Sequence, residues 1–196
     1  MSSSKINRRV FVSGAMAASL SSLTWRRARA ERPPVFRGQA RQFVEYTTPL
    51  APPSATFFGP RGRVCSLEKW RGKVVLLSFW ATWCKPCIWE MPHLDKLQAR
   101  LGGAEFDVVT VAFDEQGLAA LPKAQAFYER IGIQNLPLLF DHARELYMGF
   151  GAINRIAMPM SYVVDRTGML RGYLTGPVEW HSADAIRLIE WYIAER

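Results

Sequence analysis

The sequence predicts an α/β fold in which helices cover both faces of a sheet, a three-layer α/β/α sandwich. The first observation is KVVLLSFW, residues 73–80, a near-continuous apolar and β-branched run typical of a strand buried on both faces. The second is the alternation of such strands with segments of helical periodicity, which favours strand–helix–strand units. The third is a C-terminal pair of strands with a short turn and a last helix, which adds an antiparallel hairpin to the sheet.

The elements on either side of residues 73–80 carry clear turn and cap residues. FFGPRGRVCSL, residues 57–67, predicts a hairpin with Gly59-Pro60-Arg61-Gly62 as its turn. The segment 86–103 predicts a helix that ends at its two glycines. Cys84 stands at the N-cap position, and Pro86 falls in the first turn, where a missing N–H is harmless.

The remaining elements follow from periodicity and turn residues. The last helix is predicted to be capped by Ser182 and to turn Ile186, Ile189 and Ile193 inward. In chain order we expect a strand at 106–113, a helix at 119–131, a short strand at 136–141, a short helix at 143–151, strands at 160–165 and 169–176 around the turn 166–168, and a helix at 182–195.

Basic residues concentrate at the start of the chain, in MSSSKINRRVFVSGAMAASLSSLTWRRARA, residues 1–30. This leader holds six basic and no acidic residues, so residues 31–196 keep 19 basic against 17 acidic side chains and only +2 of the formal charge of +8. Because the basicity belongs mainly to the leader, nucleic acid is not expected as a partner.

The leader also predicts export. Arg8-Arg9 followed by Phe11 is typical of a twin-arginine signal, and small residues near its end predict cleavage after Ala30. An uncleaved anchor is the alternative, although the apolar stretch is shorter than a spanning helix needs and is interrupted by serines. We therefore expect a periplasmic protein, in a compartment where disulfides persist. Residues 31–55 are predicted to form a linker and an N-terminal arm, and residues 56–196 the folded domain.

Two of the three cysteines, Cys84 and Cys87, stand two residues apart at the start of a predicted helix. At this spacing the two sulfurs can bond within a small ring. Unpaired backbone N–H groups and the positive end of the helix dipole favour a thiolate at the first sulfur. We expect Cys84 to attack a substrate disulfide and Cys87, shielded one turn further in, to resolve the mixed disulfide.

Other roles for these cysteines have weaker support. A zinc site needs two more ligands, and the three histidines, His93, His142 and His181, are scattered without ligand spacing. A purely structural disulfide is disfavoured because so short a loop removes little entropy from the unfolded chain. Cys65, alone in the predicted hairpin, is interpreted as a small buried apolar residue, with a regulatory or intermolecular disulfide as the alternative.

The stretch WATWCKPCIWEMP, residues 80–92, resembles the active-site stretch of thioredoxin-fold proteins, specifically the exported TlpA/ResA/CcmG group. The likeness runs from about residue 43 to the end. Residues 115–141 are similar to the helix and strand that this group inserts in the fold, and GPVEWHSADAIRLI, residues 176–189, resembles the C-terminal segment of the TlpA branch. The resemblance implies a thioredoxin-like sandwich with an N-terminal β-hairpin extension and a central helix–strand insert.

Further site residues are implied by the same resemblance. Trp83 would screen the sulfurs and shape the docking surface, with ordinary packing as the alternative, and Pro86 would stiffen the dithiol ring. Pro159 matches the loop proline that is cis in thioredoxin folds. A cis bond there would expose the Met158 backbone to pair with an extended substrate beside Cys84.

Two positions depart from the pattern of thioredoxin itself. Thioredoxin carries a buried Asp where this chain has Ser78, and a serine cannot assist proton transfer to Cys87. Glu90, three residues after Cys87, lies on the same helix face. If it is partly buried, its raised pKa would let it take a proton from Cys87, and a solvated surface glutamate is the alternative. Met160 follows the loop proline where many members have Thr.

The resemblance implies thiol–disulfide exchange outside the cytoplasm, with no cofactor beyond the redox-active Cys84–Cys87 pair. The expected partners are protein disulfides of cytochrome oxidase copper-site assembly or cytochrome c maturation, and a membrane thiol reductant of the CcdA/DsbD type. Two alternatives stay open. One is a copper-binding assembly module that uses the cysteines with Met158 and Met160, since thioethers and thiolates are soft ligands. The other is a disulfide oxidase of the DsbA type.

Overall fold

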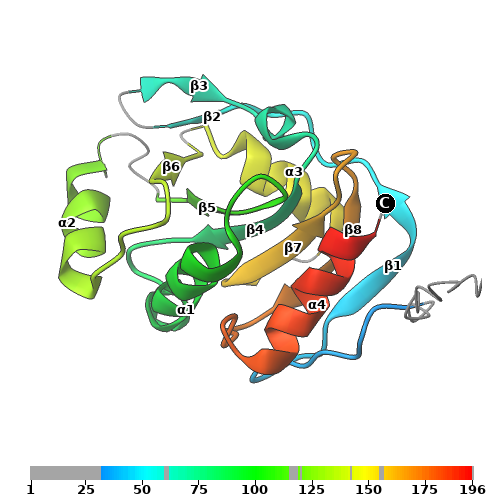
Figure 1. Cartoon of the computed structure of the whole chain (residues 1–196). Helices are drawn as coiled ribbons and strands as arrows, with labels where there is room; N and C mark the ends of the chain where they lie inside the picture. Colours follow the sequence, from blue (N-terminus) through cyan, green and yellow to red (C-terminus); the bar gives the residue numbers. More distant parts are fainter. Residues whose placement is uncertain are drawn as a thin grey trace, which may run out of the picture. The chain divides into compact units, whose positions relative to one another are not determined.

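A mixed eight-stranded sheet organises the chain in the computed structural model (Figure 1). The structure describes residues 32–59, 62–114, 119, 121–141, 143–154 and 157–195. They all belong to one unit, Glu31–Arg196. The predicted signal peptide, residues 1–30, lies outside the described residues. Within the described ranges, no helix combines the length and the apolar character that crossing a membrane requires.

Among the described residues, the α-helices α1 to α4 and the 3₁₀ helix η2 accompany the strands. The strands are β1 Val44–Leu50, β2 Phe57–Phe58, β3 Val64–Cys65, β4 Val74–Trp80, β5 Phe106–Ala112, β6 Leu139–Phe140, β7 Met160–Val164 and β8 Leu170–Thr175. The helices are α1 Lys85–Leu101, α2 Leu121–Ile131, α3 Glu145–Ile153 and α4 Ala183–Ala194, and the 3₁₀ helix is η2 Leu67–Trp70.

The strand order is β1-β8-β7-β4-β5-β6-β2-β3. β4 runs parallel to β5, and β5 runs parallel to β6, whereas β7 and β8 pair antiparallel beside β4. β4 reaches its parallel neighbour β5 through α1, and β5 reaches β6 through α2, whereas a tight turn joins β7 to β8. The strands and helices predicted from periodicity are therefore confirmed, including the hairpin of β2 and β3.

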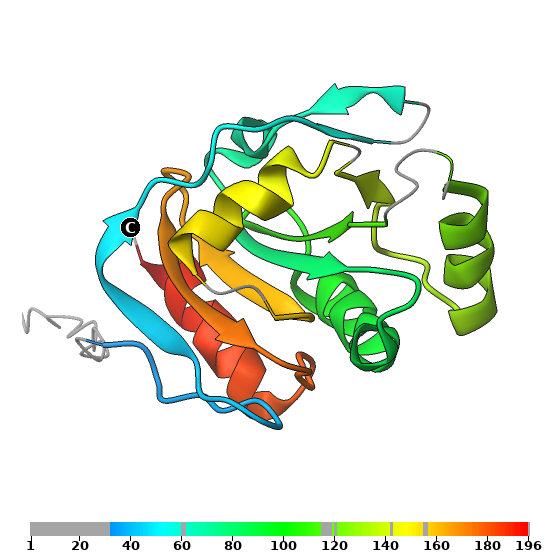
Figure 2. The ribbon, with the colours of Figure 1, turned by 180° about the vertical axis from the view of Figure 1, so that it is seen from behind.

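Both faces of β4 are covered, as its apolar sequence predicts. Val74 and Leu76 join the larger core cluster, which contains the inner faces of α1, α2 and α4. Val75 and Leu77 face the opposite side and pack in the cluster that contains α3 and η2. Figures 1 and 2 show α1 and α4 on one face of the sheet and α3 on the other, which confirms the three-layer sandwich.

One strand lies inside the segment that the sequence predicts as a linker and arm. β1 pairs antiparallel with β8, with Val44 opposite Tyr173, and forms an edge of the sheet. Most of its side chains are exposed, so backbone hydrogen bonds rather than a buried face hold it in place. An edge strand of this kind leaves little hydrophobic pattern in the sequence, which explains why it was not predicted.

Candidate dithiol site

The two cysteines lie where β4 ends and α1 begins. Cys84 has extended backbone angles and caps α1, and its Sγ accepts a hydrogen bond from the Cys87 N–H at 3.3 Å. Cys84 and Cys87 form a disulfide with their Cα atoms 5.3 Å apart. The N-cap prediction is confirmed, and the backbone donor that would stabilise a Cys84 thiolate is in place.

Burial distinguishes the two sulfurs. The side chain of Cys84 keeps 5% of its surface exposed, whereas Cys87 has none. Both belong to the core cluster on the α1 face of the sheet. Of the two cysteines, Cys84 alone keeps some exposed surface.

The end of β5 holds the loop that leads into Cys84. The Thr82 hydroxyl donates to Asp114 Oδ1 at 2.6 Å, and the Thr82 backbone N–H also points at that carboxylate, at 3.3 Å. Asp114 is 3% exposed. Sequence reasoning missed this residue, because the pairing joins positions 32 apart that meet only through the parallel register of β4 and β5.

The loop proline also lies at this end of the sheet. The Met158–Pro159 peptide bond is cis, as predicted. The next residue, Met160, pairs with Phe79 near the end of β4, so register brings the loop to the edge from which α1 starts. Met158 is half-buried against the cluster that contains both cysteines.

Two methionines near the dithiol raised the possibility of a copper site. Met160 is buried in the cluster on the opposite face of the sheet, and its Sδ accepts a hydrogen bond from the Tyr162 hydroxyl at 3.4 Å. Of Met158 and Met160, Met158 alone lies on the face of the two cysteines. The structure therefore does not bring Met160 together with the dithiol.

Trp83 and Pro86 occupy the exposed part of the site. The Trp83 side chain is 56% exposed, which excludes an ordinary packing role. Pro86 lies in the first turn of α1 and is also exposed. Together they present rigid apolar surface next to a nearly buried sulfur.

Glu90 is buried beneath the dithiol end of α1 and is not a solvated surface residue. Its side chain is 1% exposed. Glu90 Oε1 accepts from Trp180 Nε1 at 2.9 Å and from the Val178 N–H at 3.1 Å. Burial raises the pKa of Glu90 to about 8, because the charged form loses its hydration, and these two hydrogen bonds oppose the rise.

Ser78 on β4 acts on the same carboxyl group. Its proximity lowers the pKa of Glu90. The Ser78 Oγ nevertheless makes no hydrogen bond of good geometry among the described residues. Ser78 is fully buried. A buried carboxyl group on α1 and a buried serine on β4 therefore lie close to each other.

The histidines are arranged differently from the sequence prediction. His93 and His181, expected to be scattered, meet with their Nδ1 atoms 2.9 Å apart, and Glu179 lies beside them. His142 lies outside the described residues. The pair was missed because His93 lies on α1 and His181 precedes α4, 88 positions later, and only packing of the two helices joins them.

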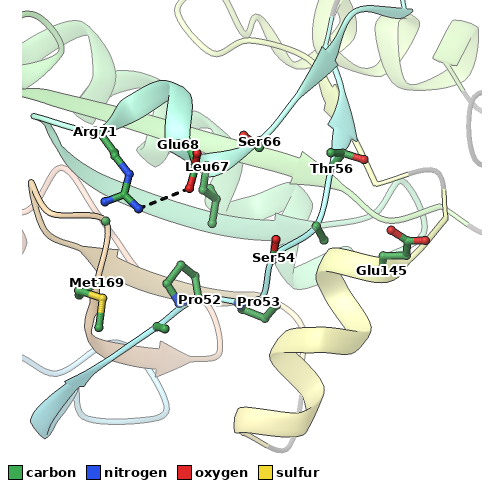
Figure 3. Close-up of a pocket in the computed structure, with 13 residues that line it drawn as sticks. Pro52, Pro53, Ser54, Thr56, Ser66, Leu67, Glu68, Arg71, Glu145 and Met169 are labelled. Carbon is green, nitrogen blue, oxygen red and sulfur yellow. Dashed lines mark hydrogen bonds and ion pairs between the residues drawn. The ribbon is translucent and has the colours of Figure 1, made fainter.

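A separate surface pocket lies away from these groups (Figure 3). Pro52 and Pro53, on the connection from β1 to β2, form one wall, and Arg71 faces Glu68 across an ion pair of 3.4 Å. Its lining includes no cysteine or histidine from the described part of the chain. The pocket therefore offers neither a thiol nor an imidazole among its described lining residues.

The fold and the dithiol together define a thioredoxin-like protein with a C-x-x-C site at the start of its first long helix. Residues 51–173 match the AhpC/TSA family, and the chain belongs to this family. The site thus combines two cysteines, a buried acid and a cis-proline loop.

Several relatives carry the names of thiol–disulfide proteins. The chain is 30% identical over 115 residues to the thiol-disulfide oxidoreductase ResA of Geobacillus thermodenitrificans, which covers 59% of this chain and 62% of that relative. The chain thus spans less than two thirds of the length of this relative. A putative thiol:disulfide interchange protein DsbE from Chlorobium tepidum superposes with a TM-score of 0.63 at 26% identity, covering 74% of this chain and 97% of that one.

A third relative is the exposed lipoprotein thioredoxin of Streptococcus pneumoniae strain TIGR4. Its structure superposes with a TM-score of 0.55 at 28% identity, covering 67% of this chain and 93% of that one. These superpositions confirm the thioredoxin-like fold that the sequence predicted.

Proposed function

We propose that this protein is a thiol:disulfide oxidoreductase that exchanges electrons with disulfides in other proteins. The observation that carries the proposal is the Cys84–Cys87 disulfide at the α1 N-terminus, with Cys84 Sγ on a backbone N–H and Cys87 buried behind it. The ResA and DsbE-type relatives support the same reaction class.

In the reducing direction the reaction has two steps. The Cys84 thiolate attacks one sulfur of the substrate disulfide, forms a mixed disulfide and releases the other sulfur, which takes a proton. Cys87 then loses its proton and attacks Cys84 Sγ. This forms the Cys84–Cys87 disulfide and releases the second substrate thiol, so two electrons and two protons pass to the substrate.

Glu90 is the proposed proton acceptor for Cys87. The two residues are three positions apart on α1 and both are buried, where water cannot take the proton directly. A pKa of about 8 means that both forms of Glu90 are accessible near neutral pH. The same group can therefore take a proton in one direction of the exchange and return it in the other.

The proposed substrate contact is the exposed rim of the site. Trp83 and Pro86 supply apolar surface, and the backbone of Met158, before cis Pro159, would pair with an extended segment of the substrate. Such pairing would hold the substrate disulfide close to Cys84 without a deep pocket.

We further propose that the protein works outside the cytoplasm as a reductant of the TlpA kind. The leader with Arg8-Arg9 supports export to the periplasm, and one relative is named as an exposed lipoprotein. The proposed targets are cysteines of cytochrome oxidase copper-site assembly factors or of apocytochrome c. A membrane thiol carrier of the CcdA/DsbD type would supply the electrons.

Partner trapping tests this function. Cys87→Ser stops the second step, so cell-envelope proteins should accumulate as mixed disulfides on Cys84 that mass spectrometry identifies. Cys84→Ser is the matched control and should trap none through position 87. If the Cys87→Ser protein forms no mixed disulfide while its Cys84 remains reduced, the proposed exchange is wrong.

A further inference from the structure

We propose that His93, Glu179 and His181 form a binding site for one divalent transition-metal ion, of the Zn²⁺ or Cu²⁺ type, separate from the dithiol. His93 lies on α1, and the other two residues lie in the segment between β8 and α4. The site uses no cysteine, so the inference does not depend on the proposed exchange activity.

The three side chains are close enough to share an ion. One potential ligand atom from each lies within 4.8 Å of the others. His93 Nδ1 is 2.9 Å from His181 Nδ1, and His181 Nε2 is 3.8 Å from Glu179 Oε1. Zn–N and Zn–O distances of about 2.0–2.2 Å place two tetrahedral ligand atoms roughly 3.3–3.5 Å apart, so small side-chain shifts would complete the site.

Hydrogen bonds to Glu90 fix the backbone around the proposed metal site. In the segment 178–181 alternate residues face opposite ways: Val178 and Trp180 are fully buried and donate to Glu90, while Glu179 and His181 face outward. Glu90 and His93 are three residues apart on α1, so the segment contacts two neighbouring positions of one helix. This anchoring holds the two halves of the site together before a metal arrives.

The aromatic neighbour limits the motion of one ligand. The ring of Trp89 lies against the His93 ring with their centroids 4.3 Å apart. The His93 ring packs in turn on the His181 ring at 4.8 Å. Both histidines are half-buried, which leaves an open position for a water molecule on the ion, as in zinc sites with three protein ligands.

The ligand set selects the class of ion. Imidazole nitrogen with one carboxylate oxygen suits Zn²⁺ and Cu²⁺, whereas Mg²⁺ and Ca²⁺ prefer oxygen ligands throughout. The alternative is a neutral His93–His181 hydrogen bond with Glu179 as a bystander, and metal titration separates the two.

The test is a Zn²⁺ titration by calorimetry on the full chain, with Cys84–Cys87 kept as the disulfide and Cys65 alkylated so that no thiol binds the ion. We expect one Zn²⁺ per chain. His93→Gln and His181→Gln should each weaken binding at least about tenfold. His142→Gln, which removes the third histidine, is the matched control and should leave the affinity unchanged.

A second measurement needs no variant. Diethyl pyrocarbonate modifies accessible imidazoles, and mass spectrometry reads each site. Zn²⁺ should lower the modification of His93 and His181 in the wild-type chain and leave that of His142 unchanged. Absence of Zn²⁺ binding at millimolar concentration, equal affinity in His93→Gln, or equal protection of all three histidines would overturn the proposal and leave a hydrogen-bonded pair only.

Discussion

Replacing Glu90 with glutamine tests the electrostatics of the site through stability. Glutamine keeps an amide oxygen that can accept from Trp180 and Val178, but it cannot ionise. The pKa of Glu90 is about 8 in the folded protein against an ordinary 4.5. Between these two values the folded protein holds one more proton than the unfolded chain, so the wild-type loses stability as the pH rises through this window.

The magnitude follows from linkage. One extra bound proton makes the free energy of unfolding fall by about 1.4 kcal/mol per pH unit. In Glu90→Gln this dependence disappears. Relative to the wild-type, the free energy of unfolding of the variant should therefore rise by about 1.4 kcal/mol for each pH unit between pH 5.5 and 7.5. The difference should become constant at pH values below the pKa of Glu90 in the unfolded chain and above its pKa in the folded protein.

The assay is urea unfolding of both oxidised proteins at several pH values in that range. Keeping the disulfide intact removes cysteine titration from the comparison. Glu129→Gln, which changes an exposed glutamate on α2, is the control for the loss of one carboxyl group at the surface. A flat difference for Glu90→Gln as well would refute a buried, mostly protonated carboxyl group at this position.

Three further substitutions test neighbouring parts of the structure. Trp180→Phe removes a hydrogen bond that favours ionised Glu90, so the pKa of Glu90 should rise above about 8 in a carboxyl ¹³C NMR titration; an unchanged or lower value would contradict this contact. Ser182→Ala removes the cap that accepts from the Ala185 N–H and should lower the free energy of unfolding by about 1 kcal/mol, measured by urea unfolding, whereas no loss would mean that water replaces the cap. Leu76→Ala opens a cavity in fully buried β4 and should cost about 2–5 kcal/mol in the same assay; a cost below about 1 kcal/mol would show that the site collapses around the smaller residue.

Much of the fold could be predicted because buried strands and helices repeat apolar residues at a characteristic spacing in the sequence. β4 and α4 were predicted from apolar spacing and from the cap at Ser182. β1 could not be predicted, since an exposed edge strand depends on backbone pairing with β8 rather than on its own side chains. β6 shrank to two residues for a related reason: its neighbours, not its own pattern, fix where pairing stops.

The candidate site divides in the same way. Local geometry joins Cys84 and Cys87 through one helix turn, so their spacing predicted that the two sulfurs can bond. Glu90 was predicted to lie on the face of Cys87, but its environment was left open between burial and solvent. The buried environment of Glu90 depends on its contact with Trp180, 90 positions later, and no local pattern connects the two residues.

The sequence by itself determined the order of the helices and of the strands after β1, the capped start of α1 and the spacing of the two cysteines, because these depend on residues within a few positions of each other. The tertiary structure decided the protonation of Glu90 and the meeting of His93 with His181, because both depend on the segment before α4 packing across α1. Burial and charge are properties of surroundings, and in this protein those surroundings come from distant parts of the chain.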